Sequence, residues 1–187
     1  MHIVLETPRL RLRQFTTGDD ADLWALDQDP QVLRYLGDPP PPPPTLAHVQ
    51  TDLLPAFIAY YTQKPGYGFW AAETRGGGAF AGWFHLRPTE HSGEVDLGYR
   101  LRRQVWGQGH ATEGSVGLID LAFSRDSIQR IIAIAMPQNQ ASVRVMQKAG
   151  MAYERTFTHP TGPKVVQYSI NKAAKQAHTT KNNPSFR

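Results

Sequence analysis

Residues 104–113 read QVWGQGHATE and place Gly107 and Gly109 between two segments of different periodicity. Ahead of them, Glu94–Leu101 alternates and is rich in β-forming residues, which predicts a strand. Behind them, Ala111–Phe123 carries apolar side chains at helical spacing. The stretch is therefore predicted to be a turn that leads from a strand into a helix. Its glycines would let a ligand approach the backbone closely.

An anion is the ligand that such a turn favours, because the first N–H groups of a helix have no partner within the helix and the helix dipole attracts negative charge. A dinucleotide fingerprint would need a third small residue where Thr112 stands, and an acidic residue that Ile131–Ala135 does not supply. A P-loop would need a Gly-Lys pair, which the sequence lacks. The pattern that fits is Q-x-x-G-x-G from Gln104 to Gly109, so we expect a pyrophosphate here.

The length of 187 residues predicts one domain, and a hydrophobic content of 40% with 19% charged residues is typical of globular proteins. The absence of cysteine excludes disulfides, a thiolate nucleophile and cysteine-bound metal, and we expect no metal. The net charge of +4 resides largely in the last sixteen residues, so we expect no nucleic-acid partner. Without a membrane-spanning run or a signal-peptide pattern, a cytoplasmic protein without a membrane partner is expected.

The N-terminal part predicts one strand and three helical segments. Thr7–Phe15 alternates apolar and basic residues, so its three arginines are expected on a solvated face. Ala21–Leu26 predicts a helix, followed by a short turn through Tyr35. Pro39–Pro44 predicts a polyproline II strut of roughly 18 Å, which we interpret as a rigid connector in preference to an SH3 ligand. Leu46–Tyr61 predicts the next helix.

The remaining elements predict a mixed sheet. The expected strands are Tyr67–Thr74, Ala79–Leu86, Glu94–Leu101, Gln129–Met136, Ala152–Phe157 and Lys164–Ile170, with a further helix at Asn139–Ala149. A right-handed crossover through the helix Ala111–Phe123 would make the strands on either side of it a parallel pair, whereas the other strands are expected to be antiparallel. The fold class is therefore α/β, a mixed and mostly antiparallel sheet flanked by helices, with a parallel central strand pair. Residues from Lys172 onward are polar and are predicted to be disordered.

Three blocks of sequence, in this element order, resemble the RimJ/RimL-like branch of the GNAT superfamily of N-acetyltransferases. They are TPRLRLR at residues 7–13, LGYRL followed by WGQGHATE at residues 97–113, and NQASVRVMQKAGM at residues 139–151. The resemblance extends from residue 7 to about residue 170, so residues 1–171 are assigned to a GNAT domain and residues 172–187 to a tail. It implies direct transfer of an acetyl group from acetyl-CoA to a primary amine, which in that branch is a protein N-terminus.

The resemblance also implies where acetyl-CoA binds. The pantetheine arm would lie along the strand that ends at Leu101, and the pyrophosphate would meet the amides of the glycine turn. Arg102, Arg103 and His110 are nearby cations that would either meet this charge or remain solvated. Asn139 would bind the pantetheine amide in addition to capping its helix. The expected cofactor residues are Leu101, Arg102, Arg103, Gln104, Gly107, Gln108, Gly109, His110, Ala111, Thr112, Asn139 and Ser142.

Proton transfer requires a base for the amine and an acid for the leaving thiolate. Glu94 and Asp96 share one face of a strand, and Asp96 occupies the acidic position before LGY in the resembling branch, so it is the first candidate base and Glu94 the second. Many GNAT enzymes use a tyrosine as the acid, but Met146 stands at that position here. The branch resemblance points to Ser142 as the acid instead. His85 and Tyr99 are spare candidates that we interpret as structural.

Several alternatives remain open at the level of sequence. The same scaffold could use another acyl donor such as succinyl-CoA, or bind acyl-CoA as a sensor without turnover. The acceptor could be a protein N-terminus, a polyamine, an antibiotic amine or an amino acid, and the Pro39–Pro44 run is expected to form one wall of its site. A homodimer is common in the resembling branch, and the sequence does not set the oligomeric state.

Overall fold

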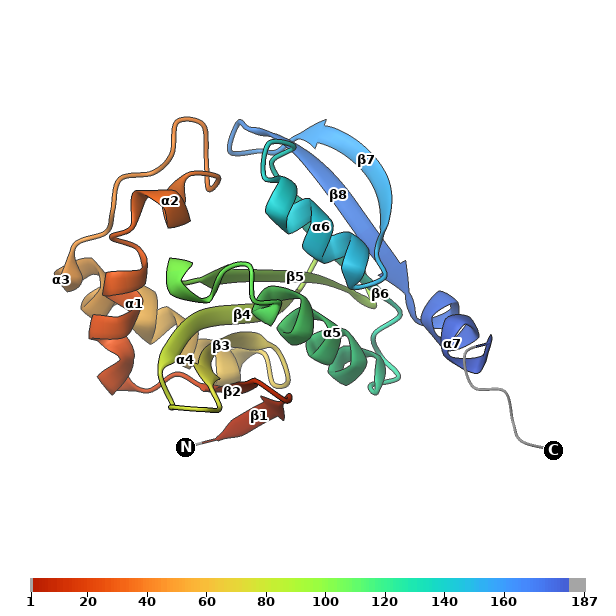
Figure 1. The fold of residues 1–187 in the computed structure, drawn as a ribbon, viewed down its shortest axis with the longest axis horizontal. Coiled ribbons are helices and arrows are strands. Elements are labelled where there is room, and N and C mark those ends of the chain that lie inside the picture. The colour runs from red at the N-terminus through yellow and green to blue at the C-terminus, as the bar shows by residue number, and fades with distance from the viewer. Residues whose placement is uncertain (1, 182–187) are drawn as a thin grey trace.

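A computed structural model describes residues 2–181 of the chain, and within them eight strands form one sheet in the order β1-β2-β3-β4-β5-β6-β8-β7 (Figure 1). Neighbouring strands are antiparallel except for β5 and β6, which are parallel. The predicted mixed α/β sheet with one parallel pair is therefore confirmed. The strands are β1 (Ile3–Glu6), β2 (Leu10–Gln14), β3 (Gly68–Thr74), β4 (Phe80–Pro88), β5 (Glu94–Leu101), β6 (Arg130–Ala135), β7 (Ala152–Thr158) and β8 (Lys164–Asn171).

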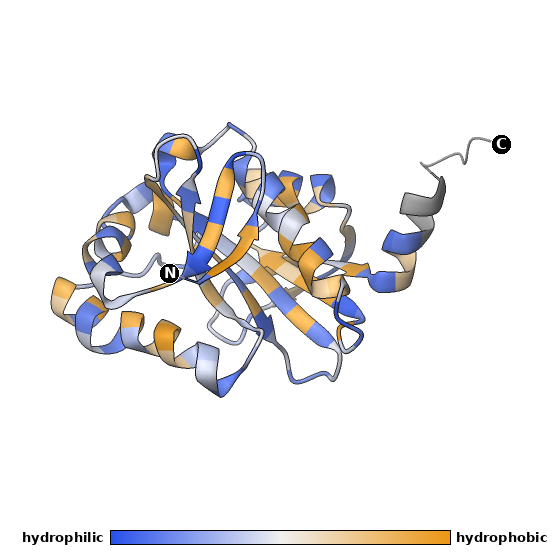
Figure 2. Cartoon of the chain, turned by 90° about the horizontal axis from the view of Figure 1, so that it is seen from below, coloured by the Kyte–Doolittle hydropathy of each residue, from blue (hydrophilic) through white to orange (hydrophobic). Residues whose placement is uncertain are grey.

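Helices cover both faces of the sheet. On one face, α5 (His110–Phe123) and α6 (Gln140–Lys148) lie across the central strands (Figure 1). On the other face, α1 (Asp20–Leu26), α2 (Pro30–Leu33) and α4 (Leu54–Gln63) supply side chains to a second core, and the short α3 (Leu46–His48) leads into α4. Figure 2 shows hydrophobic residues interleaved with hydrophilic ones along these strands and helices, which is how each element presents one face to a core.

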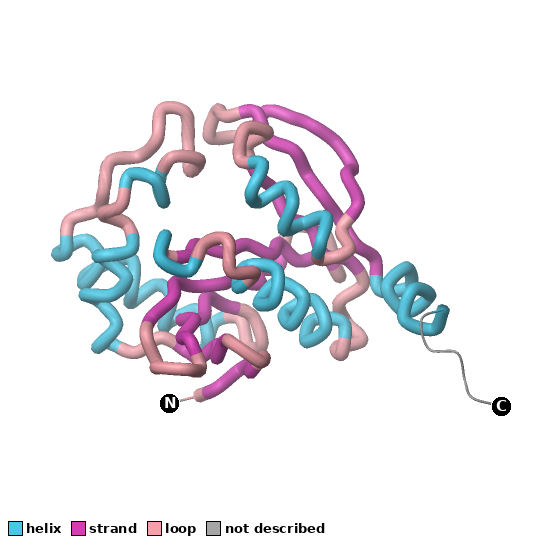
Figure 3. Tube along the Cα trace, in the orientation of Figure 1, coloured by secondary structure: helices cyan, strands magenta, loops and turns pink. Residues whose placement is uncertain are grey.

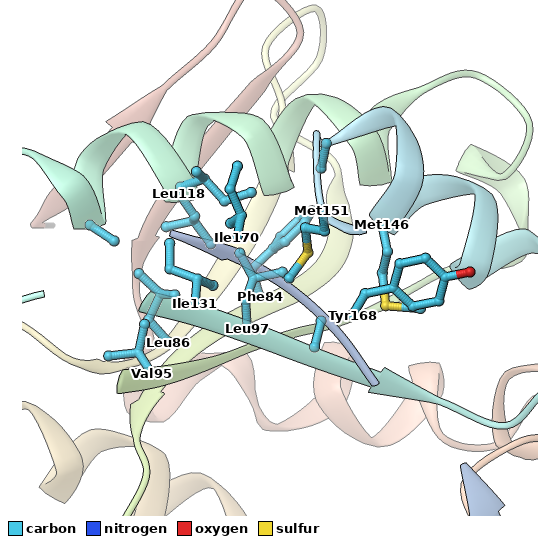
Figure 4. Packing of buried hydrophobic residues seen from close by; sticks show 14 of the residues in the cluster. Phe84, Leu86, Val95, Leu97, Leu118, Ile131, Met146, Met151, Tyr168 and Ile170 are labelled. Carbon is cyan, nitrogen blue, oxygen red and sulfur yellow. The ribbon is translucent and has the colours of Figure 1, made fainter. Parts of the chain in front are cut away.

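The larger core lies between the sheet and the α5–α6 layer. Phe84 of β4 and Leu118 of α5 are fully buried in it, beside Ile131 of β6 (Figure 4). α5 approaches the sheet so closely that a Cβ atom on Gly114 would lie 2.3 Å from the ring of Phe84. A larger residue at this position would therefore force the helix away from the strand on which it packs.

The second core is aromatic. Phe57 of α4 stacks on Phe69 of β3 with ring centroids 3.9 Å apart, and Trp83 of β4 meets both rings edge-on at 5.9 and 5.7 Å. Phe15 and Phe80 extend this cluster toward α1. Buried aromatic pairs of this geometry contribute packing beyond their buried area, and they fix α4 against the middle of the sheet.

The parallel strands β5 and β6 separate soon after they meet. Their pairing covers only Glu94–Asp96 of β5 and Arg130–Ile132 of β6. β5 nevertheless continues to Leu101, paired on its other side with β4. The second half of β5 is consequently an unpaired edge in the middle of the sheet.

The unpaired edge belongs to the odd-numbered residues of β5. The carbonyl of Gly93 accepts from Arg130 on the β6 side, whereas Arg102 N donates to Ala81 on the β4 side. Because backbone groups alternate in direction along a strand, Leu97, Tyr99 and Leu101 direct their backbone groups toward the open edge. This edge could accept an extended ligand as an additional strand.

The structure differs from the sequence prediction for the helix Leu46–Tyr61. A single π-helical turn over Val49–Leu53 joins α3 to α4, and Leu54 N donates to the carbonyl of Val49, five residues earlier. Pro55 provides the reason, since it lacks the N–H that would bond the carbonyl of Thr51 in a regular helix. The prediction also omitted β1, whose Val4 and Leu5 pack against the larger core.

The C-terminal segment differs as well. α7 (Lys172–Lys181) is a helix where the sequence predicted disorder. Lys172 Nζ reaches the carbonyl of Arg125 at 3.1 Å and the carboxylate of Asp126 at 3.2 Å, and alanines with high helix propensity follow. The last residues of the predicted tail, 182–187, lie outside the described part of the chain. Among the described residues, no helix combines the length and apolar character that crossing a membrane requires.

The predicted solvated face of the first strand is wrong for Arg13. Its guanidinium is buried and bonds Asp19 through two nitrogens at 2.6 and 2.8 Å and Glu73 at 2.6 Å. Burial opposes ionisation of Asp19, but hydrogen bonds from Arg13 and Thr16 outweigh it and hold the pKa of Asp19 below its ordinary value. The alternation of the strand identifies a polar face, but α1 and α4 cover that face in the fold.

We expect Arg13→Ala to lower the free energy of unfolding by about 3–5 kcal/mol, because it leaves two buried carboxylates without their cation. Arg11→Ala on the same strand is the matched control, since its ion pair with Glu6 is exposed and should contribute less than about 1 kcal/mol. Urea denaturation at pH 7 measures both variants. Equal losses in the two variants would contradict the structural role of Arg13.

Candidate functional site

The first of two adjoining cavities opens at the N-terminus of α5. It has a volume of about 560 Å³ and lies between this terminus, the end of β5 and the start of α6. Seven of the predicted cofactor residues form its wall at these elements, and an eighth, Ser142, faces both cavities. These eight are Leu101, Gly107, Gly109, His110, Ala111, Thr112, Asn139 and Ser142.

The glycine turn has the geometry expected of an anion site. Gly107 and Gly109 adopt the left-handed conformation with φ of 73° and 84°, which favours glycine over other residues. Gly109 is the N-cap of α5, and no side chain caps the helix there. The first N–H groups of α5 are therefore available to a ligand. The strand–turn–helix predicted from the sequence is confirmed.

The first strand holds this turn in place. Glu113, in the first turn of α5, accepts hydrogen bonds from the backbone N of Arg9 at 2.8 Å and from the hydroxyl of Thr7. The guanidinium of Arg9 bonds the same carboxylate and also donates to the carbonyl of Gln108 within the turn. Residues 7–9, which precede β2, thus hold the glycine turn in place from outside the cavity.

Four predicted cofactor residues do not line either cavity. Arg102 pairs with Asp22 at 2.8 Å and Arg103 with Asp29 at 3.1 Å, so both guanidinium groups are directed toward the α1–α2 region. The carbonyl of Gln104 accepts from the side chain of Gln108 at 2.8 Å. The guanidinium groups of Arg102 and Arg103 thus join the turn to α1 and α2, and the side chain of Gln108 bonds back to the backbone of the turn.

Sequence reasoning missed four cations that do line the first cavity, and one of them, Arg100, is paired with Asp27. Arg144 and Lys148 lie four residues apart on α6, and Arg34 approaches from the loop after α2. The spacing of the two on α6 was a usable signal. Arg34 carried none, because its position depends on the long loop between α2 and α3 (Figure 3). Within the described chain, Pro39–Pro44 in that loop lines neither cavity, although Tyr35 and Leu36 line both.

The second cavity has a volume of about 480 Å³ and adjoins the first across the open edge of β5. Tyr99, Arg100, Ser142 and Val145 line both cavities. Residues from the α6 face and residues from the α4 face contribute to its walls together. The separation of β5 from β6 therefore connects the two sides of the sheet.

Asp96 lies on the wall of the second cavity with two partners from β4. Its Oδ2 atom is 2.6 Å from Arg87 Nη2 and 3.2 Å from His85 Nε2. Burial would raise the pKa of Asp96, but the hydrogen bonds with His85 and Arg87 hold this pKa below its ordinary value. Asp96 is therefore a carboxylate at neutral pH.

His85 is buried beside it, with 8% of its surface exposed. Burial lowers the pKa of His85 below its ordinary value of 6.5, although Asp96 opposes this shift, so the ring is neutral at pH 7. With Nε2 bonded to Asp96, the Nδ1 atom has no hydrogen-bond partner among the described residues. The ring packs over Gly98, where an added Cβ would lie 2.5 Å from its Cε1 atom.

Ser142 lies in the first turn of α6, where the two cavities meet. Its hydroxyl is 3.1 Å from the hydroxyl of Tyr99, and its backbone N donates to Asn139 Oδ1 at 3.2 Å. Burial raises the pKa of Tyr99, so this phenol is protonated at neutral pH. Tyr99, which we interpreted as structural, thus belongs to the wall of the site. Met146 is buried and lines the second cavity (Figure 4).

Glu94, the second candidate base, does not lie in the site. Its carboxylate pairs with Arg130 at 2.7 Å and accepts from the hydroxyl of Thr89 at 2.9 Å. It is absent from the walls of both cavities within the described chain. Although Glu94 and Asp96 share a face of β5, the cavity begins only where β6 departs, which is at Asp96.

Comparison with known proteins agrees with this geometry. Residues 9–152 match the family described as acetyltransferase (GNAT) domain. The uncharacterized protein YkkB of Bacillus subtilis is 31% identical over 158 residues, covering 82% of this chain and 87% of that protein. The FsC-acetyl coenzyme A-N(2)-transacetylase of Aspergillus fumigatus is 31% identical over 184 residues, covering 90% of this chain and 76% of that protein.

A solved structure of RimL, a ribosomal L7/L12 alpha-N-protein acetyltransferase in complex with coenzyme A, has the same fold. The TM-score is 0.78 at 18% identity, and the alignment covers 92% of this chain and 99% of that one. The glycine turn, the open strand edge and the matched residues 9–152 lead to one conclusion: the chain belongs to the GNAT acetyltransferase family.

Proposed function

We propose that this protein transfers an acetyl group from acetyl-CoA directly to a primary amine. The observation that carries the proposal is the continuous path from the glycine turn, along the open edge of β5, to the buried Asp96–His85 pair. An anionic cofactor is held at one end of this path and a proton acceptor stands at the other. Both are required for acyl transfer to an amine.

The cofactor is proposed to bind along this path. Its pyrophosphate meets the N–H groups at the start of α5, where Gly107 and Gly109 leave room for close approach. Arg144 and Lys148 add positive charge on the opposite wall. The pantetheine arm pairs with backbone groups on the open edge of β5, like an added strand in the place that β6 has left. The carbonyl of Leu101 is not among them, because it already accepts from Trp106 Nε1 at 2.8 Å. The N–H groups of this edge then polarise the thioester carbonyl.

The acceptor amine is deprotonated by the Asp96–His85 pair. Asp96 keeps a proton on His85 Nε2, which leaves the Nδ1 lone pair to take a proton from the amine, directly or through water. Asp96 itself is a weak base because its pKa is lowered, so we assign it the role of orienting His85. This is the division of labour between carboxylate and imidazole in catalytic triads.

Acetyl transfer then forms one bond and breaks another. The amine nitrogen forms a bond to the acetyl carbon, and the carbon–sulfur bond of the thioester breaks. The departing thiolate takes a proton from Ser142, which the Tyr99 phenol replenishes across 3.1 Å. His85 then releases to solvent the proton that it took from the amine, and Tyr99 regains a proton from solvent, so that no net proton is gained or lost by the protein. In this proposal Ser142 takes the place of the tyrosine that many GNAT enzymes have at the position of Met146, as the branch resemblance implies.

Membership of the RimJ/RimL-like branch, with a protein N-terminus as acceptor and a homodimer as assembly, stays a proposal that rests on the three sequence blocks. Transfer from another acyl donor such as succinyl-CoA remains the first alternative, and acyl-CoA sensing without turnover the second. The buried Asp96–His85 pair favours turnover, because a sensor has no need of a neutral imidazole with an unpaired nitrogen. The assignment of residues 1–171 to the catalytic domain likewise stays a proposal.

Gly109→Ala tests the cofactor site. A side chain at a φ of 84° is strained, and relaxation would move the first N–H groups of α5, so we expect the Kd for coenzyme A to rise about tenfold, equivalent to about 1.4 kcal/mol. Gly77→Ala is the control, since its added Cβ meets no atom within 4 Å. Isothermal titration calorimetry measures both. An unchanged Kd for coenzyme A in Gly109→Ala would show that the pyrophosphate does not bind at this turn.

The pH dependence of kcat tests the base. Activity requires neutral His85, so kcat should fall as the pH decreases through the pKa of His85, which lies below 6.5. Asp96 raises this pKa, whereas the neighbouring Arg87 and Arg100 lower it. We therefore expect Asp96→Asn to move the acidic limb to lower pH and to reduce kcat about a hundredfold. An unmoved limb with intact kcat would exclude the pair as the base.

Ser142→Ala and Tyr99→Phe test the acid. If the two hydroxyls deliver one proton as a unit, the double variant should lose no more kcat than the more impaired single variant. Each single variant is expected to reduce kcat by about tenfold to a hundredfold. Multiplicative losses in the double variant, measured with saturating acetyl-CoA, would show that the two hydroxyls act independently.

A further inference from the structure

Buried polar atoms without a hydrogen-bond partner gather around the second cavity. Among the described residues, seven side-chain atoms are buried and unpaired, and five of them belong to residues that line this cavity. Buried polar groups in folded proteins almost always have a partner, so each exception requires an explanation. Five exceptions around one cavity indicate a polar ligand. They are Trp83 Nε1, His85 Nδ1, Arg87 Nε, Arg100 Nε and Ser115 Oγ.

Three of these atoms can only donate. The indole N–H of Trp83 and the Nε–H groups of Arg87 and Arg100 have no acceptor capacity. Trp83 is 7% exposed and His85 8% exposed, so bulk water does not reach these atoms, and a ligand meets them when their side chains turn toward the cavity. A ligand with several acceptor oxygens is the complement of this set.

The three donors surround His85. Trp83 stacks on its ring with centroids 5.7 Å apart, and the Arg100 guanidinium lies 5.1 Å from the Trp83 centroid. Arg87 shares the carboxylate of Asp96 with His85. Acceptor oxygens that meet these donors therefore lie within a few atoms of an amine that is positioned at His85.

The carboxylates near the cavity are already engaged. Asp96 Oδ2 is bonded by His85 and Arg87, and Asp27 Oδ2 pairs with Arg100 at 2.5 Å. Asp27 Oδ1 is unpaired, but Asp27 is not part of the cavity wall. A polycationic acceptor needs several free carboxylates, which this cavity does not provide.

Part of the remaining wall is apolar. Phe57, Phe69 and Leu53 also line the cavity, and the Phe69 ring packs edge-on against His85 with ring centroids 5.3 Å apart. The Phe57–Phe69 stack gives a flat aromatic surface that is suited to an apolar or aromatic body. A volume of about 480 Å³ accommodates a small molecule of this kind.

We propose that the acceptor is a primary amine that carries a carboxylate close to the amino group and an apolar or aromatic side chain, as an α-amino acid does. This inference rests on the proposed acetyltransferase function and specifies its substrate class. The carboxylate binds the N–H groups of Trp83, Arg87 and Arg100, the amine faces His85, and the apolar side chain packs on Phe57 and Phe69. Polyamines and aminoglycosides are disfavoured.

A panel of acceptors tests the substrate class. Phenylalanine, phenylalaninamide and phenethylamine share one body and differ in the group beside the amine, and spermidine, kanamycin and an N-terminal peptide represent the other classes. Release of free CoA from acetyl-CoA gives kcat/KM, expressed per neutral amine because the carboxamide lowers the pKa of its neighbour. We expect phenylalanine to exceed phenylalaninamide and phenethylamine at least tenfold.

The outcomes separate the two proposals. Transfer to spermidine, kanamycin or the peptide with a kcat/KM equal to or above that for phenylalanine would overturn the substrate class and leave the acetyltransferase standing. Tight CoA binding without transfer to any amine in the panel would overturn the proposed function itself.

A conservative variant tests the donor assignment. Trp83→Phe keeps an aromatic ring but removes the unpaired N–H, so the preference for phenylalanine over phenylalaninamide should fall about tenfold while kcat/KM for phenethylamine changes little. Trp24→Phe, in the second core and outside both cavities, should leave all three values unchanged. A uniform loss on all three acceptors in Trp83→Phe would show a packing role only and would contradict the proposal.

Discussion

The early separation of β5 from β6 is the constraint on which the rest of the structure depends. After three residue pairs the two parallel strands diverge, and a row of backbone groups is left unpaired in the middle of a sheet. Such an edge is normally a liability. Here α5 and α6 flank it on one face and the aromatic layer of α4 on the other, and two cavities adjoin it.

This arrangement divides the chemistry between the two faces. The anion-binding turn, Ser142 and Tyr99 belong to the α5–α6 side, whereas His85, Asp96 and the aromatic wall belong to the α4 side. A donor and an acceptor entering from opposite faces meet only at the gap. In the proposed reaction, the sheet itself would therefore impose the orientation of the two reactants.

Features that depend on neighbouring residues could be predicted from the sequence, and features that depend on register could not. The strand–turn–helix around Gly109 and the helix that begins after Asn139 follow from local pattern. The partner of Asp96 does not, because it requires Asp96 to lie opposite Arg87 and Gly98 opposite His85 on β4. The same applies to Arg13, since its alternation could not show that a helix layer covers that face.

The packing of His85 over Gly98 has a consequence for how the site can change. Because any side chain at position 98 would collide with the imidazole ring, the glycine on β5 and the histidine on β4 constrain each other across the strand pair. A chain that replaces Gly98 must first give up the histidine, and a chain that loses the histidine no longer needs the glycine. The two positions are therefore expected to change in a fixed order, in which the histidine is lost before the glycine is replaced.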